Sequence, residues 1–457
     1  MRTPGKIMVG VDIGTTKICA LVTRKNENGK TEVLGIGKAD SHGVLRGEVA
    51  NIDKTVHSIV QAVEQAEKAS GEKITNVYVG IAGQHIRSMQ NRGILTRTNS
   101  ENEINKEDVK SMIRDMHKLA LNPGERIIHV LPQEFYVDSV LALDTPIGMC
   151  GSRLEANFHI ITGKVSAAQN IKRCIEKAGL VMDGLILEPL ASAAAVLDEN
   201  EKEAGVALVD IGGGTTDLAI FQDGIIRHTC VIPFGGNIIT EDIKNGFKIM
   251  KNQAEQLKTR FGSAVALETK ENQVISIPGI KGRDPKEISV ASLSKVIQSR
   301  MEEIFEQVYF EIKASGYANK LNAGIVVTGG GSKLTHIKQL LEYVTGLDSR
   351  IGYPIEHLAV GFNPELKHPL FATGIGLVEK AFEEYEEDFN SDLNIETFDT
   401  LKEPAAQKEI EKPETEEKGE DDVIQKAINA NPGKWWEKII NKIPDWLSDD
   451  NHKDFEE

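Results

Sequence analysis

Two short segments, 198 residues apart in the chain, repeat the same combination of aspartate, glycine and threonine. The first begins at Asp12 and reads Asp-Ile-Gly-Thr-Thr-Lys, and the second begins at Asp210 and reads Asp-Ile-Gly-Gly-Gly-Thr-Thr-Asp. Backbone N–H groups in a turn of glycine and threonine are not covered by side chains, so several of them can donate hydrogen bonds to one phosphate. The two segments together therefore predict a site for a phosphorylated ligand.

We expect each residue type in these segments to have a separate role in binding the phosphorylated ligand. Asp12 and Asp210 repel a phosphate, but they can hold Mg²⁺ through water, and the ion then bridges phosphate oxygens. The ammonium group of Lys17 can neutralise charge on the β- or γ-phosphate. The alternative is two ordinary hairpin turns, but consecutive glycines raise the entropy of the unfolded chain without adding packing. The turn residues expected at the phosphates are Gly14, Thr15, Thr16, Gly212, Gly213, Gly214, Thr215 and Thr216.

A third glycine cluster follows the apolar segment 325–327 and consists of Gly329, Gly330 and Gly331. Glycine at this place lets a flat adenine ring lie against the backbone, and Lys333 can cover the other face of the ring. The alternative is a tight turn between a strand and a helix. The two aspartate segments elsewhere in the chain favour the nucleotide interpretation.

Short apolar runs flank both aspartate segments, at 7–11 and 18–22 and again at 206–209 and 218–221. β-Branched runs on either side of a polar turn predict a hairpin, so the chain contains one hairpin motif twice. Elsewhere, strands alternate with helices, which is typical of α/β proteins with some α+β insertion. The predicted helices are 52–69, 109–119, 168–174 and 293–312, and the further strands are 74–81, 127–130, 158–161 and 325–328.

The negative charge of the chain is concentrated in one segment. The 457 residues are 40% hydrophobic and carry a net charge of −16, which is enough apolar material for several cores. Residues 383–422 contain 17 acidic and 4 basic residues, a net charge of −13. Too few apolar residues remain there to offset the entropy of ordering the segment, so we expect a disordered acidic linker at 383–430.

Cysteine spacing and hydropathy indicate the compartment. Cys19, Cys150, Cys174 and Cys230 lie far apart without Cys-x-x-Cys or histidine spacing, which predicts neither a zinc site nor a disulfide framework and fits a reducing cytoplasm. No apolar run reaches the roughly 18 residues of a membrane-spanning helix, and no cleavable apolar leader is evident. We therefore expect a protein that is neither secreted nor membrane-spanning.

The C-terminal segment 431–450 has the pattern of an amphipathic helix that lies on a membrane surface. Lys434, Lys438 and Lys442 fall on or beside the polar face, where they can attract anionic lipid. A segment of about 15 residues cannot span about 30 Å of hydrocarbon. The alternative is a helix docked on the core. The apolar residues of the segment are Trp435, Trp436, Ile439, Ile440, Ile443, Trp446 and Leu447.

Taken together, the two hairpins and the third glycine cluster resemble the nucleotide-binding signature of the actin and heat-shock chaperone ATPase superfamily. This resemblance implies two lobes with a duplicated ribonuclease-H-like core, ATP and Mg²⁺ between them, and connecting helices at 187–194 and 372–377. It implies that Glu188 orients the attacking water, although a helix N-terminal glutamate also simply favours the macrodipole. The further residues implied beside the nucleotide are Gly235, Gly236, Asn237, Glu255 and Lys258.

Segments 131–138, 146–149 and 231–237, with the amphipathic tail, narrow the resemblance to the FtsA family of bacterial cell-division proteins. That resemblance implies polymerisation on the cytoplasmic face of the inner membrane at the division site, with contacts to anionic lipid and to other division proteins, and no nucleic acid partner. It implies that the C-terminal peptide of FtsZ docks near 238–322. ATP is then chiefly an assembly ligand with at most slow hydrolysis. The basic residues of this stretch that suit an acidic peptide are Arg283, Lys295 and Arg300.

The resemblance also implies a domain organisation. Its parts are subdomain 1A (1–83, 165–198 and 370–382), inserted subdomain 1C (84–164), subdomain 2A (199–237 and 323–369), subdomain 2B (238–322), the linker (383–430) and the helix (431–450). The alternatives within the superfamily are a sugar- or acetate-type kinase and a pilus-assembly ATPase. A kinase needs a catalytic aspartate facing an acceptor pocket, and neither alternative needs a lipid-binding tail.

Overall fold

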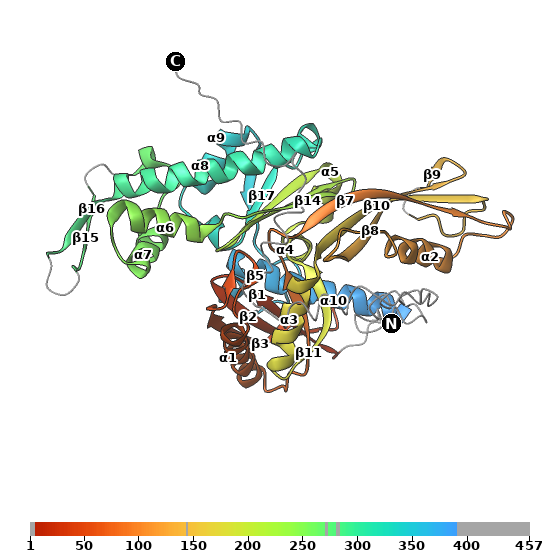
Figure 1. Cartoon of the computed structure of the whole chain (residues 1–457), viewed down its shortest axis with the longest axis horizontal. Helices are drawn as coiled ribbons and strands as arrows, with labels where there is room; N and C mark the ends of the chain where they lie inside the picture. Colours follow the sequence, from red (N-terminus) through yellow and green to blue (C-terminus); the bar gives the residue numbers. More distant parts are fainter. Residues whose placement is uncertain (1–4, 143–144, 270–272, 280–283, 391–457) are drawn as a thin grey trace, which may run out of the picture. The chain divides into compact units, whose positions relative to one another are not determined.

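The computed structural model describes residues 5–142, 145–269, 273–279 and 284–390 of the chain (Figure 1). The chain divides into two compact units, Met1–Thr400 and Leu401–Glu457, and the second unit lies outside the described residues. Arg283 and the apolar residues predicted to bind the membrane, from Trp435 to Leu447, also lie outside them. Among the residues that are described, no helix is long and apolar enough to cross a membrane.

A five-stranded sheet forms the centre of the first lobe. Its strands are β1 (Ile7–Ile13), β2 (Lys17–Lys25), β3 (Thr31–Asp40), β6 (Asn76–Ile81) and β11 (Val181–Leu187), in the order β11-β6-β1-β2-β3. The first three strands pair antiparallel in chain order, and β6 and β11 continue the sheet in parallel. Helices α1 (Ile52–Ser70) and α3 (Val165–Lys177) pack on this sheet and on each other. The hairpin predicted around the first aspartate segment is confirmed.

The second lobe repeats this arrangement. Its strands are β12 (Val206–Ile211), β13 (Thr216–Gln222), β14 (Ile225–Ile232), β17 (Ile325–Thr328) and β18 (Ser349–Ile351), in the order β14-β13-β12-β17-β18. Again three antiparallel strands in chain order are followed by two strands parallel to the first. The second hairpin is therefore confirmed, and the repeated strand order shows that the duplication extends from the motif to the whole sheet.

A four-stranded antiparallel sheet is inserted into the first lobe. It consists of β7 (Arg87–Thr96), β8 (Glu125–Val137), β9 (Val140–Ala142) and β10 (Arg153–Lys164), in the order β7-β10-β8-β9. Helix α2 (Lys106–Met116) packs on it and shares a core in which Met112, Leu154 and Phe158 are buried. The helix begins before the predicted residue 109 because the side chain of Asn105 caps its first turn.

Three helices between residues 236 and 314 pack together beside the second sheet. They are α6 (Gly236–Phe247), α7 (Lys251–Phe261) and α8 (Val290–Ala314), and they share a core with the second sheet that includes Ile243, Leu257 and Phe305. The remaining described elements are α5 (Glu199–Ala204), α9 (Ile337–Thr345), β4 (Val44–Leu45), β5 (Glu48–Val49), β15 (Val274–Ile277), β16 (Lys286–Ser289), η1 (Ala266–Glu268), η2 (Ala318–Lys320), η3 (Gly330–Lys333), η4 (Pro364–Lys367) and η5 (Pro369–Phe371).

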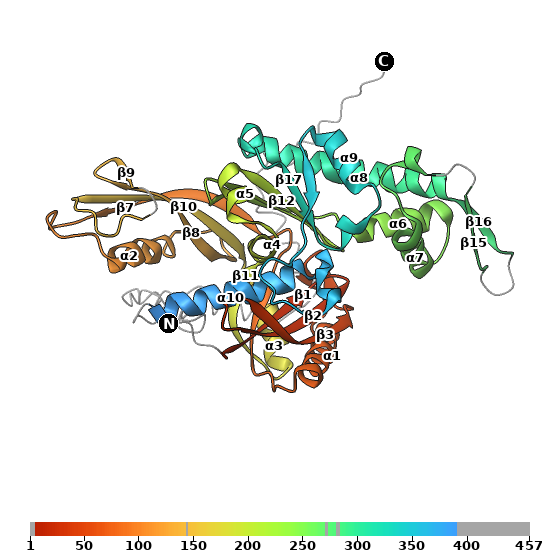
Figure 2. The ribbon, with the colours of Figure 1, turned by 180° about the vertical axis from the view of Figure 1, so that it is seen from behind.

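Two helices, α4 (Glu188–Val196) and α10 (Ala372–Asn390), cross at close range, and Figure 2 shows α10 running along the first sheet beside β1. Gly376 permits the crossing, because a Cβ atom added to it would lie 1.7 Å from the carbonyl oxygen of Ala191. Every residue of α4 after Glu188 is buried, as expected for a helix packed on several sides. The close crossing of the two predicted connecting helices therefore explains why small residues occur in them.

Helix α10 is longer than the sequence suggested. We assigned residues 383–390 to the disordered linker, but they form the last part of α10. The reason is an apolar face that continues past Phe382, since Tyr385 packs in the same cluster as Met8. Glu383 and Glu384 are exposed, so the first acidic residues of the predicted linker lie on the solvent side of a helix.

Candidate functional site

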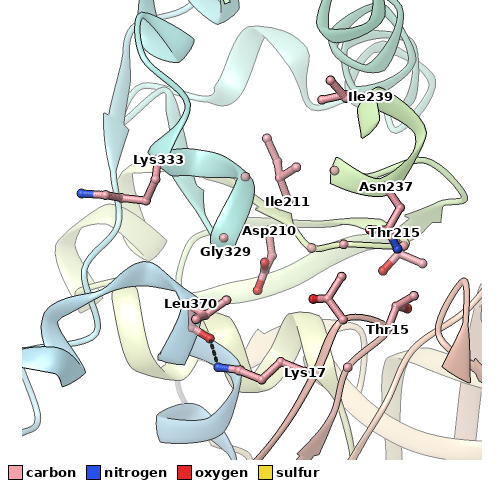
Figure 3. A pocket seen from close by; sticks show the side chains of 18 of the residues that line it. Thr15, Lys17, Asp210, Ile211, Thr215, Asn237, Ile239, Gly329, Lys333 and Leu370 are labelled. Atoms are coloured by element: carbon pink, nitrogen blue, oxygen red, sulfur yellow. Dashed lines mark hydrogen bonds between the residues drawn. The ribbon is translucent and has the colours of Figure 1, made fainter. Parts of the chain in front are cut away.

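A cavity of about 520 Å³ lies where the two hairpins meet (Figure 3). It is bounded by the tips of β1–β2 and β12–β13, the start of α4, helices α6 and α7, and the turn before α9. Of the residues predicted to contact the nucleotide, all line the cavity except Thr216 and Gly235, and Glu188 lines it as well. The structure therefore brings segments from distant parts of the chain into one site.

The two hairpin tips face each other at van der Waals distance. A Cβ atom added to Gly214 would lie 2.5 Å from Thr15 Oγ1, and one added to Gly213 would lie 2.4 Å from Thr16 Cγ2. The consecutive glycines are thus explained by the approach of the opposite hairpin, since any side chain at these positions would push the lobes apart. The threonine hydroxyls and the glycine backbone come to the same edge of the cavity.

The third glycine cluster closes the cavity next to the second hairpin. β12 and β17 are parallel neighbours, so their carboxyl ends lie at the same edge of the sheet. Gly329 has a φ of +79°, and a Cβ atom on it would lie 2.1 Å from Asp210 Oδ1. A residue with a side chain cannot occupy this position without displacing the aspartate.

Five carboxyl groups line the cavity. Four of them, from Asp12, Glu188, Asp210 and Asp217, influence one another, and the fifth, from Glu255, pairs with Lys258. Burial raises the pKa of Asp12 to about 6, with a smaller raising effect from Asp210 and a lowering one from Lys17. Burial, followed by the charges of the neighbouring aspartates, raises the pKa values of Glu188 and Asp217 well above their ordinary range. Such a cluster carries unfavourable negative charge, and a divalent cation between the groups would reverse the direction of these shifts.

The second hairpin aspartate is held by two hydroxyl groups. Ser192 of α4 donates a hydrogen bond of 2.6 Å to Asp210 Oδ2, and Thr373 of α10 donates one of 3.3 Å to the same oxygen. Both bonds lower the pKa of Asp210 and oppose the larger raising effect of burial. The sequence analysis missed both hydroxyl residues, because each lies within a predicted connecting helix and no local pattern links it to Asp210.

Asp217 is a further residue that the sequence analysis left unassigned. It closes the second segment, is 5% exposed, and pairs with Asp210 across the hairpin. Thr215 Oγ1 donates a hydrogen bond of 3.3 Å to its Oδ2, whereas its Oδ1 is buried and has no hydrogen-bond partner. An unsatisfied buried carboxylate oxygen fits a site for a hydrated cation.

Two basic residues of the site, Lys17 and Lys258, are already engaged in contacts within the protein. Lys17 Nζ donates to the carbonyl oxygen of Leu370 at 3.4 Å and lies 4.3 Å from the centre of the Phe371 ring. Lys258 Nζ lies 2.8 Å from Glu255 Oε2 and donates to the carbonyl oxygen of Gly236 at 2.8 Å. Burial lowers the pKa of Lys258, against a raising effect from Glu255. The Glu255 and Lys258 pair therefore lies at the cavity as a hydrogen-bonded unit.

The two predicted residues that do not line the cavity stabilise its wall. Thr216 Oγ1 donates to the carbonyl oxygen of Phe234 at 2.8 Å. A Cβ atom added to Gly235 would lie 2.7 Å from the carbonyl oxygen of Gly212, which in turn accepts a hydrogen bond of 2.9 Å from the N–H of Gly236. These contacts hold the start of α6 against the second hairpin.

The sequence did not predict the apolar side chains that also line the cavity, among them Ile239, Met301 and Leu334.

The residues expected to contact a peptide partner differ in their surroundings. The guanidinium group of Arg300 pairs with Asp242 at 2.6 Å and also with Glu303. Lys295 is exposed on α8, and the described residues give it no ion pair. Of the two described residues, Lys295 is thus the one whose charge is not already compensated.

Two lobes built on sheets of the same strand order, with facing hairpin tips at a cavity, define an actin-like ATPase fold. A solved PilM–PilN type IV pilus biogenesis complex has this fold, with a TM-score of 0.60 and 16% sequence identity over 82% of this chain and 98% of that chain. At this low identity the likeness concerns the fold alone.

Sequence relatives give the family. A family model described as "Cell division protein FtsA" matches residues 207–376, and another, "SHS2 domain inserted in FTSA", matches residues 83–162. The cell division protein FtsA of Pseudomonas aeruginosa is 41% identical over 374 residues, which cover 82% of this chain and 89% of that protein. That of Escherichia coli K12 is 33% identical over 401 residues, covering 86% and 94%. The chain belongs to the FtsA family of cell division proteins, which decides against the kinase and pilus-assembly alternatives.

Proposed function

We propose that this protein binds ATP together with Mg²⁺ in the cavity between its lobes. The observation that carries the proposal is the approach of the two hairpin tips, with Thr15 and Thr16 against Gly214 and Gly213. Backbone N–H groups of both tips are placed to donate to phosphate oxygens. Asp12 and Asp210 would hold Mg²⁺ through water, and the ion would supply positive charge to the phosphates.

The remaining cavity residues suit a nucleoside. The glycine turn at 329–331 leaves room for the flat adenine ring, and Lys333 at its end lines the cavity. Glu255 and Lys258 are placed to hydrogen-bond the ribose. Lys17 lies at the first hairpin with its charge available to the terminal phosphates once it leaves the carbonyl oxygen of Leu370.

We further propose that ATP favours self-association, and that the assembled protein attaches FtsZ to the inner membrane. One short amphipathic helix at 431–450 binds anionic lipid weakly, whereas a polymer presents many such helices at once and converts weak contacts into stable attachment. The subdomain boundaries given above, with FtsZ docking on 238–322, are part of this proposal. Lys295 is the described residue best suited to an acidic peptide.

Isothermal titration calorimetry with ATP in the presence of Mg²⁺ tests the nucleotide site. We expect one ATP per chain, with binding weakened by EDTA and by the substitution Asp210→Asn. The control is Asp53→Asn, because the Asp53 side chain is 88% exposed on α1, away from the cavity. Absence of binding to the unsubstituted protein would refute the proposal.

Co-sedimentation with anionic vesicles tests the membrane part. Removal of residues 431–457 should abolish binding, and ATP should strengthen the binding of the complete chain. Undiminished binding by the shortened chain would eliminate the anchor. A labelled C-terminal peptide of FtsZ should bind the protein, and Lys295→Glu should weaken that binding more than Lys30→Glu, which lies in the first lobe.

A further inference from the structure

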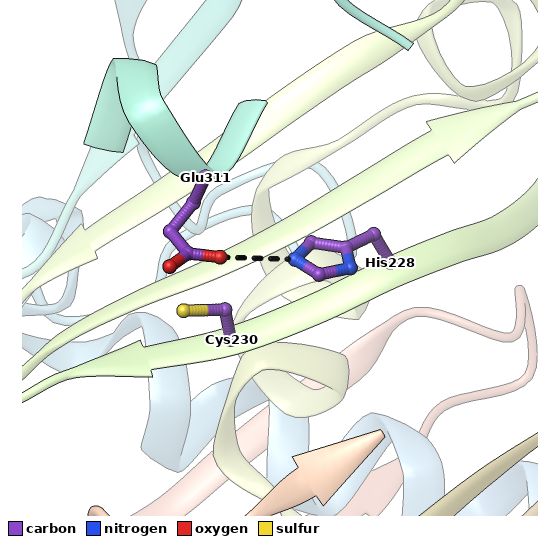
Figure 4. A group of neighbouring side chains, drawn as sticks. All are labelled: His228, Cys230 and Glu311. Atoms are coloured by element: carbon purple, nitrogen blue, oxygen red, sulfur yellow. Dashed lines mark ion pairs between the residues drawn. The ribbon is translucent and has the colours of Figure 1, made fainter. Parts of the chain in front are cut away.

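Three side chains that commonly bind metal ions lie together outside the cavity: His228 and Cys230 on β14 and Glu311 on α8 (Figure 4). Their ligand atoms all lie within 4.8 Å of one another, and His228 Nε2 is 3.6 Å from Glu311 Oε2. Within the described residues, no other group of histidine, cysteine and carboxylate side chains has this spacing.

The backbone explains why these groups meet. His228 and Cys230 are two residues apart on a strand, so their side chains leave the same face of the second sheet. Helix α8 packs against β14 and β13, and Glu311 stands on its turn between the buried residues Val308 and Ile312. The side chain between the two on β14, Thr229, contacts His159 of the inserted sheet at 3.2 Å instead.

The cluster lacks positive charge. His228 Nε2 is buried and has no hydrogen-bond partner. The described residues offer Glu311 no lysine or arginine. A divalent cation would satisfy the imidazole nitrogen and compensate the carboxylate charge of Glu311 at once.

We propose that His228, Cys230 and Glu311 bind one Zn²⁺ ion. A nitrogen, a sulfur and a carboxylate oxygen are ligands that Zn²⁺ accepts, and three protein ligands leave one tetrahedral position for water. Tetrahedral ligands at zinc distances are about 3.5 Å apart, so small rotamer changes suffice. On binding, the thiol of Cys230 gives its proton to the solvent and the thiolate forms the bond to zinc, while His228 donates the lone pair of Nε2.

The site is open enough for an ion to enter, since the side chains of His228 and Glu311 are 24% and 28% exposed. Bound zinc would link β14, an edge strand of the second sheet, to α8. Sequence spacing alone did not indicate such a site, because Glu311 is far from the other two ligands along the chain.

Titration of the complete chain with Co²⁺ tests the proposal. The titration is done in excess Mg²⁺, so that sites made only of oxygen ligands are already occupied. We expect one Co²⁺ per chain with a thiolate-to-cobalt charge-transfer band and the visible bands of tetrahedral cobalt, and Zn²⁺ should displace it. The band should be lost in Cys230→Ser and kept in Cys150→Ser, which changes an exposed cysteine elsewhere. No band in the unsubstituted protein, or an undiminished band in Cys230→Ser, would overturn the proposal.

Two further measurements guard against misfolded variants. Circular dichroism and thermal midpoints in EDTA establish that each variant is folded. Glu311→Gln keeps the thiol and should weaken the affinity for Zn²⁺ by about 10-fold or more, because a ligand is lost. Zinc should also raise the thermal midpoint of the unsubstituted protein but not that of Glu311→Gln. Equal zinc affinity and equal stabilisation in both proteins would contradict the site.

Discussion

Gly214 at the tip of the second hairpin touches Thr15 at the tip of the first, so that an added Cβ atom would lie 2.5 Å from Thr15 Oγ1 and 3.0 Å from its Cβ. Rotation of the threonine cannot relieve this contact, since its own Cβ is in the way. Gly214→Ala should therefore separate the tips and weaken ATP binding by about 10-fold or more, given strain of about 1–3 kcal/mol. Calorimetry with Mg²⁺ and ATP measures the effect.

The control for this prediction is Gly246→Ala. Gly246 lies in helix α6, and a Cβ atom on it would meet nothing within 4 Å. Alanine is also the better helix former. ATP affinity should therefore be unchanged and the thermal midpoint unchanged or raised. If both substitutions left ATP affinity intact, the contact between the tips would not matter for nucleotide binding.

A second prediction concerns the crossing of α4 and α10. Gly376→Ala places a Cβ atom 1.7 Å from the backbone oxygen of Ala191, which cannot move without shifting the helix. We expect a loss of about 3 kcal/mol in the free energy of unfolding. Gly374→Ala on the same helix meets only the side-chain end of Leu21, at 2.9 Å, and should be tolerated better. Thermal unfolding of the two variants measures the difference, and an equal loss of stability in both would contradict the prediction.

Local patterns in the sequence were sufficient for much of the fold. Each hairpin depends on two adjacent apolar runs and a turn, and helices α1, α2, α3 and α8 each have their own periodicity. These elements could therefore be predicted from short segments. The glycines at 212–214 could be linked to phosphate binding by their unusual run, although the steric reason for Gly213 and Gly214 is the opposite hairpin. Side-chain contacts between residues far apart in the chain produce no comparable pattern in the sequence, so they could not be predicted from it.

Asp210 illustrates what the sequence could not provide. Its hydroxyl partners Ser192 and Thr373 are 18 and 163 residues away, and both looked like ordinary small residues of packed helices. The end of α10 was also missed, since the acidic residues near Glu383 suggested disorder while Tyr385 packs with the core. The composition of such a helix is dominated by the charged residues of its exposed face, so the few apolar residues of its buried face are easily overlooked.

A third prediction follows from the raised pKa of Asp12, which burial brings to about 6. The carboxyl group binds its proton more tightly in the folded protein than in the unfolded chain. Its contribution to stability is therefore fully present below about pH 4 and is lost as the pH rises through about 6. The asparagine of Asp12→Asn does not ionise. With nucleotide and Mg²⁺ absent, its thermal midpoint should therefore rise relative to that of the unsubstituted protein as the pH increases from about 4 to about 6.

Saturating ATP and Mg²⁺ should reverse this trend, because a cation favours the ionised carboxyl group. Binding should then release protons, which calorimetry in buffers of different ionisation enthalpy detects. Asp183→Asn serves as the control, since Asp183 is exposed outside the cavity. A midpoint difference that stayed constant with pH would show that Asp12 has an ordinary pKa.

A fourth prediction concerns the junction between the inserted sheet and the second lobe. Arg227 on β14 pairs with Glu134 on β8, and the Arg227 side chain is only 8% exposed. Glu134→Ala leaves this charge with Asp223 at 3.3 Å, and should cost about 2 kcal/mol of stability. The pair of Arg24 and Glu32 is of the same kind but exposed, at 47% and 43%. Glu32→Ala should cost at most about 1 kcal/mol, and equal losses in denaturant unfolding would contradict the distinction.

The last prediction concerns hydrolysis. Glu188 begins α4 at the cavity, and Gly80 makes room for it, since a Cβ atom there would lie 2.9 Å from Glu188 Cγ. Burial and three neighbouring carboxyl groups raise the pKa of Glu188 well above its ordinary value, which makes its ionised form a stronger base toward the attacking water. If Glu188 orients that water, Glu188→Gln should lower ATP turnover by about 100-fold or more and leave the Kd for ATP nearly unchanged.

Glu255→Gln provides the matched comparison, because Glu255 also lines the cavity but pairs with Lys258. It should weaken ATP binding and leave turnover at saturating ATP nearly intact. Turnover of the unsubstituted protein should also fall at low pH as Glu188 takes up its proton, whereas the residual turnover of Glu188→Gln should not follow that profile. Unaltered turnover in Glu188→Gln would reduce Glu188 to a residue that stabilises the start of α4 through the helix dipole, and ATP would then act on assembly through binding alone.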